Sequence, residues 1–197
     1  TSNMINVLRQ VSITGISSLG MFMIILLGDI DLSVGSMYAF IGVISAIVFK
    51  TTESTCLTLI VALALGIAIG LFNGIFTAKF RVPAFITTLA TMSICRGFAY
   101  IITGGSPIGV TNPKFTFLGT GYVFNLIPLP VIFMIIVLIL GMILVKHTRF
   151  GRYIYSCGGN AQAAKWSGIN VDKIRITVYV IAGFLNGFAA IILAGRL

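Results

Sequence analysis

Long apolar runs alternate with short polar stretches along the whole chain. Six runs are long enough to cross most of a hydrocarbon core of ~30 Å as helices rising 1.5 Å per residue. This pattern predicts an all-α fold, a polytopic transmembrane helix bundle with about six spans in one domain over residues 1–197. The predicted spans are Val11–Leu27, Val34–Phe49, Leu57–Thr77, Ala84–Ile102, Leu129–Val145 and Ile176–Ala194.

The segments between the runs differ in character. Thr103–Pro128 holds most of the prolines and predicts an extended loop, with room for a re-entrant or interfacial piece. Within the third run, Gly66, Gly70 and Gly74 recur at four-residue spacing. Small residues in that register let a neighbouring membrane helix approach closely.

Composition supports a membrane environment. Hydrophobic residues make up 58% of the chain, charged residues 9%, and the mean hydropathy is +1.10. A soluble domain would carry about 25% charged residues. The net charge of +9 indicates basic loops on one membrane face and not a nucleic-acid partner. The three cysteines, interpreted as apolar fillers, are Cys56, Cys95 and Cys157.

The distribution of Lys and Arg predicts the orientation. With six alternating spans, eight cations fall on the side of residues 28–33, 78–83 and 146–175, and four on the other. Positive-inside bias then puts residues 146–175 in the cytoplasm. Both chain ends look cut, so we expect the sequence to be part of a longer protein.

Two of the four acidic residues, Asp29 and Asp31, stand between the first two apolar runs. An ionised carboxylate at mid-bilayer costs about 2.5–3.5 kcal/mol. Either the link lies at the cytoplasmic surface, or it is a helix break held below the surface. We expect Ser33 to cap the next helix, and Gly28 and Gly35 to allow close packing. Arg96, inside the fourth run, would pair with one of the acids, line a pathway, or lie near the interface.

The polar region after the fifth run contains a short helix signature. Asn160 suits an N-cap and Gly168 a left-handed position after the helix end, which predicts about two helical turns between them. A helix this short needs a docking partner to be stable. The alternatives are a groove on another protein and the protein's own bundle.

Chemistry-bearing motifs are scarce. The sole histidine, His147, lies in a basic run and is interpreted as an interfacial side chain. No G-x-x-x-x-G-K-[ST] phosphate loop occurs, so any ATP hydrolysis belongs to another subunit. We predict no catalytic residues, no metal and no cofactor.

A five-residue motif recurs. Gly70–Gly74 (GLFNG) resembles Gly183–Gly187 (GFLNG), on helices predicted to run in opposite directions. This similarity fits an inverted repeat that brings Asn73 and Asn186 to the pathway. Simple helix packing or coincidence is the alternative.

Four blocks of the sequence resemble the membrane permease subunits of bacterial ABC importers for simple sugars, of the ribose type. One departure is Asp29, where the family usually has glycine or another small residue. The family's first helix and final third have no counterpart here, which again suggests a fragment of a roughly ten-helix permease. The blocks are Gly28–Ser36 (GDIDLSVGS), Val82–Pro107, Thr148–Val171 and Lys173–Leu197.

The resemblance implies a multi-pass protein of the bacterial plasma (inner) membrane. Two permeases would pair as a homodimer, dock two cytoplasmic ATPases, and receive sugar from a periplasmic or lipid-anchored binding protein. Membrane lipids would surround the pair. The alternative is an ion-coupled secondary transporter that uses Asp29, Asp31 and Arg96. The coupling residues that the resemblance implies are Gly158, Gly159, Asn160, Ala163, Ala164, Ser167, Gly168 and Ile169.

Overall fold

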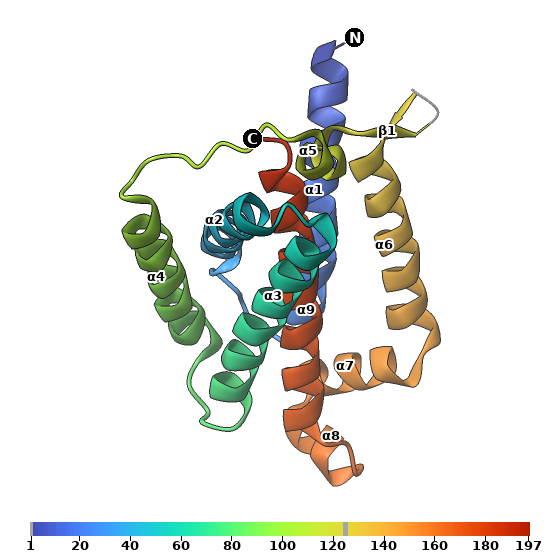
Figure 1. Ribbon diagram of the computed structural model, residues 1–197. Helices are drawn as coiled ribbons and strands as arrows, with labels where there is room; N and C mark the ends of the chain where they lie inside the picture. Colours follow the sequence, from blue (N-terminus) through green and yellow to red (C-terminus); the bar gives the residue numbers. More distant parts are fainter. Residues whose placement is uncertain (1, 124–125) are drawn as a thin grey trace.

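The computed structural model describes residues 2–123 and 126–197, which form a bundle of helices with one short hairpin (Figure 1). The all-α, polytopic prediction is confirmed, because six helices are long and apolar enough to cross a membrane. These six are α1 (Ser2–Leu26), α2 (Val34–Thr52), α3 (Thr55–Ala78), α4 (Ala84–Thr103), α6 (Leu129–His147) and α9 (Val171–Ala194). The shorter elements are α5 (Pro113–Thr120), α7 (Arg149–Gly159), α8 (Ala161–Trp166), β1 (Tyr122–Val123) and β2 (Ile127–Pro128).

Helix α9 is the centre of the bundle and has the largest buried share of the six spans. It packs against α1, α2 and α3, while α4 and α6 lie at the outside (Figure 1). The helix begins at Val171, earlier than the predicted span, because the Asn170 side chain caps it by accepting from the Lys173 N–H at 3.0 Å. Asp172 in its first turn also suits the positive end of a helix dipole.

The glycines of α3 and α9 form the closest helix contact. A methyl group added at Gly66 would lie 2.3 Å from the Gly183 carbonyl oxygen, and one added at Gly183 would lie 2.2 Å from the Gly66 oxygen. The predicted small-residue face of α3 therefore meets a matching face on α9. The same reciprocal geometry recurs one turn along, where Gly70 faces the Tyr179 oxygen and Gly187 faces the Ala62 oxygen.

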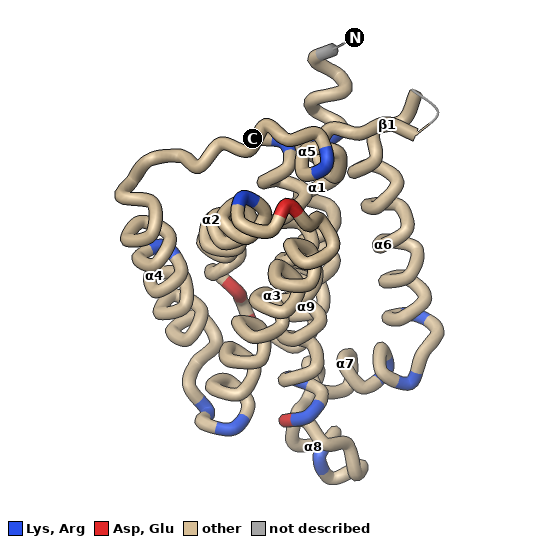
Figure 2. Tube along the Cα trace, in the orientation of Figure 1, with Lys and Arg blue, Asp and Glu red and all other residues tan. Residues whose placement is uncertain are grey.

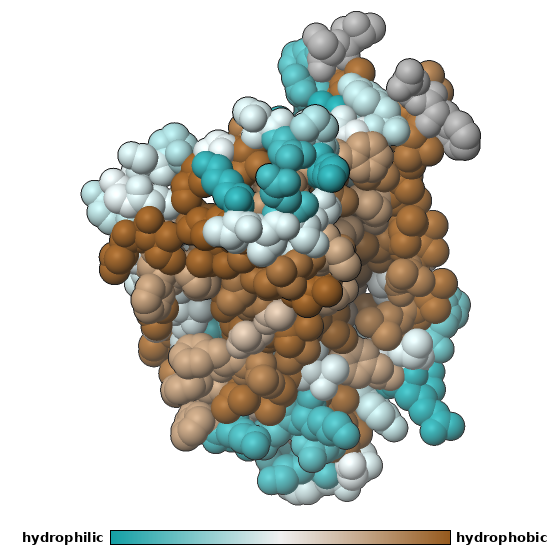
Figure 3. All heavy atoms as spheres, viewed as in Figure 1, coloured by the Kyte–Doolittle hydropathy of each residue, from teal (hydrophilic) through white to brown (hydrophobic). Residues whose placement is uncertain are grey.

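Apart from the two acids between α1 and α2, charged residues gather toward the two ends of the bundle (Figure 2). The visible surface has a broad apolar band between two hydrophilic ends (Figure 3). That arrangement is what a membrane requires, because the band meets hydrocarbon and the ends meet water.

The connection between α4 and α6 is the predicted long loop, and it contains α5 and a two-stranded antiparallel hairpin. Tyr122 pairs with Pro128 and Val123 with Ile127. Arg9 of α1 holds this region in place: its guanidinium donates to the Thr120 carbonyl oxygen and lies 4.9 Å from the centre of the Tyr122 ring.

Candidate functional site

Residues 148–170, here called the docking segment, cross one end of the bundle between α6 and α9 (Figure 1). Side-chain caps order this segment. Thr148 Oγ1 accepts from the Gly151 N–H at 3.2 Å and begins α7, and Asn160 Oδ1 accepts from the Ala163 N–H at 2.9 Å and begins α8. Such caps satisfy backbone donors that short helices otherwise leave free. The N-cap prediction for Asn160 is confirmed, whereas α7 was not predicted.

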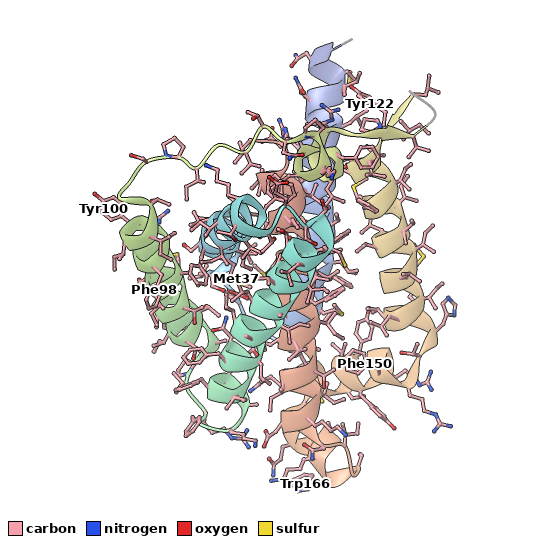
Figure 4. The ribbon with its side chains drawn as sticks, viewed as in Figure 1. Met37, Phe98, Tyr100, Tyr122, Phe150 and Trp166 are labelled. Atoms are coloured by element: carbon pink, nitrogen blue, oxygen red, sulfur yellow. The ribbon has the colours of Figure 1, made fainter. Side chains whose placement is uncertain are left out.

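Helix α8 ends as the sequence predicted. Gly168 has φ +83°, and the N–H groups of Gly168 and Ile169 donate to Lys165 and Ala164 carbonyl oxygens, both at 3.0 Å. The helix rests on the bundle through Ala164, which is buried, while Trp166 is 79% exposed. Figure 4 shows Trp166 at the far tip of the molecule, directed away from the bundle.

The predicted coupling residues divide into two groups. Gly158 lies against α1, because a methyl group added there would be 1.7 Å from the Leu26 carbonyl oxygen. With Ala164 and the half-buried Ile169, it belongs to the attachment of the segment to the bundle. The exposed face is formed by Gly159, Asn160, Ala163, Ser167 and Gly168.

Residues 27–33, here called the acidic link, connect α1 to α2. Asp31 is the buried acid, with 4% of its surface exposed, and its Oδ1 accepts from Ser33 N–H at 2.8 Å and Ser33 Oγ–H at 2.6 Å. Figure 2 places the link between the two ends of the bundle, so it is a helix break below the surface. The pKa of Asp31 is raised, because burial disfavours its charged form more than the Ser33 hydrogen bonds stabilise it.

Two expectations about the acidic link are wrong. The Ser33 side chain makes no capping hydrogen bond to α2, because its backbone is helical (φ −80°, ψ −16°) and not extended as capping requires; its hydroxyl donates to Asp31. Neither Gly28 nor Gly35 allows a close approach, since a methyl group added at either one would meet nothing within 4 Å. Gly28 is needed for its backbone: it has φ +79°, which other residues rarely adopt.

Asn73 of α3 joins the acidic link to α4. Its Nδ2 donates to Ser33 Oγ at 3.3 Å, and its Oδ1 accepts from Thr91 Oγ1 at 2.5 Å. Asn73 is fully buried, so these bonds satisfy an amide that would be costly to leave unpaired. The result is a polar connection across α2, α3 and α4.

Asp29 has a different partner from the one expected. Its Oδ2 lies 3.2 Å from Nε of Arg175 and accepts from the Tyr179 hydroxyl at 3.4 Å. Burial raises the pKa of Asp29, while the charge of Arg175 and the Tyr179 hydrogen bond oppose that rise. The predicted sixth span began at Ile176, which left Arg175 in the preceding polar region. Asn170, a good N-cap residue, was the signal that the helix begins earlier and includes Arg175.

The predicted pairing of Arg96 with Asp29 or Asp31 is wrong. Arg96 is exposed on α4, and the ion pairs among residues 2–123 and 126–197 do not include it. The packing of α9 brings Arg175 to Asp29, and Ser33 donates the hydrogen bonds that Asp31 accepts. The network that an ion-coupled transporter would need is therefore not assembled, and no observation favours that alternative.

Asn186 of α9 is also buried, with 2% of its surface exposed, and its Nδ2 lies 3.9 Å from the Met37 sulfur. The reciprocal glycine contacts define a local two-fold axis that exchanges Gly66 with Gly183 and Gly70 with Gly187. That axis matches Asn73 with Ala190, and Asn186 with Ile69. The asparagine-based inverted repeat is therefore wrong in register, and helix packing accounts for the glycines. A pathway role for the asparagines stays a prediction.

Within residues 2–123 and 126–197, no three His, Cys, Asp or Glu side chains form a group that could hold a metal ion. The six packed apolar spans, with a capped helix projecting from one end, define a polytopic membrane protein.

Comparison with known proteins identifies the family. Residues 3–197 match the family described as branched-chain amino acid transport system / permease component, and the chain belongs to that family. It is 42% identical to the ribose import permease protein RbsC of Haemophilus influenzae, covering 99% of this chain and 61% of that protein. The corresponding values for RbsC of Bacillus subtilis are 41%, 99% and 61%.

A further relative is the L-arabinose transport system permease protein AraH of Escherichia coli, which is 40% identical over 95% of this chain and 57% of that protein. The chain thus spans less than two thirds of the length of these relatives. No solved structure matches it.

Proposed function

We propose that this chain belongs to the transmembrane subunit of an ABC importer that moves a simple sugar, such as a ribose-like monosaccharide, across the bacterial inner membrane. A separate cytoplasmic ATPase drives the movement, and a periplasmic or lipid-anchored binding protein delivers the sugar. Two permease copies form the pathway, as a homodimer surrounded by membrane lipids. The resemblance to ribose and arabinose permeases supports the sugar class.

The docking segment is the observation that carries this proposal. Helix α8 is too short to be stable alone, yet it is capped at both ends and anchored through buried Ala164. Its remaining residues face away from the bundle, so the helix presents an ordered surface to a partner. A rigid surface can transmit a partner's movement, because little ordering is needed on contact.

The test is uptake by the complete permease, purified with its ATPase and reconstituted in vesicles with the binding protein. Radiolabelled ribose and arabinose are supplied outside, and ATP is supplied on the ATPase side. We expect sugar to accumulate only with ATP and to persist when a protonophore removes the proton gradient. Uptake that stops with the protonophore but not with ATP depletion would refute the proposal.

A further inference from the structure

We propose that Asp29, Arg175 and Tyr179 are positioning residues that transmit movement of the docking segment to the acidic link at the start of α2. This inference rests on the proposed function, because it needs an ATPase that moves the docking segment. The juxtaposition that carries it is an ion pair between the non-helical link and the first turns of α9.

The first step runs from the docking segment to Arg175. Helix α9 begins at Val171, directly after the segment, and Asn170 fixes that junction through its bond to the Lys173 N–H. Arg175 is the fifth residue of α9. A displacement of α8 therefore reaches Arg175 through continuous, capped backbone.

The second step crosses from α9 to the acidic link. Arg175 Nε and the Tyr179 hydroxyl both approach Asp29 Oδ2, at 3.2 and 3.4 Å. The side chains of Arg175 and Asp29 are only 20% and 11% exposed. Water therefore screens this pair little, and the attraction is stronger than at an exposed site.

The acidic link is also flanked by the middle of the docking segment, where α7 ends. Gly158 lies against the Leu26 carbonyl oxygen, next to where the link begins. The docking segment thus contacts the end of α1, beside the acidic link, through α7. It is also connected to Asp29 through Arg175 of α9, the helix that follows it. Between these two contacts lies Gly28, whose backbone makes the link a natural hinge.

The third step runs from the link into the membrane helices. Asp31 and Ser33 bond to each other, Ser33 bonds to Asn73, and Asn73 bonds to Thr91. The Thr88 hydroxyl of α4, which donates within its own helix to Ala84, also lies 3.3 Å from the Ile30 carbonyl oxygen. A shift of the link would therefore change the positions of α2, α3 and α4 together, through elements in direct contact.

A second ion pair at the same end provides a matched control. Arg81, in the turn between α3 and α4, lies 3.2 Å from Asp172 of α9. The side chains of Arg81 and Asp172 are 64% and 39% exposed, so water screens this ion pair, and such pairs contribute little. Losing it should leave transmission unchanged.

The experiment measures labelling of an Ile30→Cys variant of the complete permease with its ATPase, in a Cys56→Ser background because Cys56 is the exposed cysteine among the described residues. A membrane-impermeant maleimide is the probe, with and without ATP. We expect ATP to change the labelling rate by about fivefold or more. Asp29→Asn and Arg175→Gln should abolish this change, whereas Arg175→Lys and the control Asp172→Asn should keep it.

An unaltered ATP-dependent change in labelling rate in Arg175→Gln would overturn the inference. Loss of that change in Asp172→Asn would also overturn it, as would its absence in Ile30→Cys without further substitutions. Ribose uptake is measured in the same vesicles. An Arg175-dependent response without sugar uptake would leave the inference standing and refute the sugar assignment. Ribose uptake together with an unaltered labelling response in Arg175→Gln would leave the sugar assignment standing and refute the inference.

Discussion

Two consecutive glycines of α7, Gly158 and Gly159, allow the same substitution to be compared in opposite surroundings. In Gly158→Ala, the new methyl group would lie 1.7 Å from the Leu26 carbonyl oxygen and 2.9 Å from the Leu26 carbonyl carbon. Real Cβ atoms keep at least 3.0 Å, and the obstacle is backbone, so α7 must move away from α1. Overpacking of this kind costs about 3 kcal/mol. In Gly159→Ala, the methyl group meets nothing within 4 Å.

Thermal unfolding of the purified permease in detergent measures the difference. A loss of about 3 kcal/mol corresponds to a fall in Tm of about 6–12 °C for a chain of this size. Gly159→Ala should leave the Tm unchanged or raise it slightly, because alanine favours a helix. ATP-driven uptake should fall in Gly158→Ala as well, because the docking segment is displaced. Equal Tm values for the two variants would refute the assigned contact between α7 and α1.

Three further predictions follow from the packing and the charges. In Gly183→Ala, the new methyl group would lie 2.2 Å from the Gly66 oxygen, so this variant should lower the free energy of unfolding by about 2 kcal/mol. Gly97→Ala, where the methyl group meets nothing within 4 Å, should leave that free energy unchanged. An equal fall in the free energy of unfolding for both variants, measured by chemical denaturation, would contradict the close approach of α3 and α9. The raised pKa of Asp31 means that its ionised form is disfavoured on folding, so stability is greatest below the unfolded pKa of about 3.9 and falls as pH rises through the folded value. The Tm of Asp31→Asn should therefore equal or exceed that of the native protein at neutral pH, and the difference should shrink toward pH 4. A Tm below the native value at every pH would show instead that the charge of Asp31 is needed. Ala163→Arg and Gly159→Trp should reduce uptake at unchanged Tm and membrane insertion, and unaltered uptake in both would argue against docking of the ATPase at this face.

The buried polar groups connect structure to the proposed cycle. Asp31, Ser33, Asn73 and Thr91 satisfy one another in the buried interior of the bundle. Each bond is more valuable there than in water, because the alternative is an unpaired group. The acidic link can therefore stay non-helical inside the bundle, where it joins α1 to α2.

The sequence by itself determined the elements whose cause is local. Helix spans follow from apolar length, and Asn160 and Gly168 bound α8 because capping depends on residues a few positions away. Ser33 shows the limit of this reasoning, since its residue type suits a cap but its helical backbone conformation does not, and its hydroxyl bonds to Asp31.

Tertiary structure alone decided which distant side chains meet. Asp29 and Arg175 are far apart in the chain, and they pair because α9 fills the centre of the bundle and presents its first turns to the acidic link. Arg96 has the same charge but lies on α4 at the periphery, so charge pattern could not choose between them. The register of the α3–α9 contact was likewise set by where the two backbones approach each other. In that register Asn73 and Asn186, which the repeated motif had matched, are not equivalent. Apolar length and caps are properties of neighbours in the chain, whereas ion pairs and register are properties of packing.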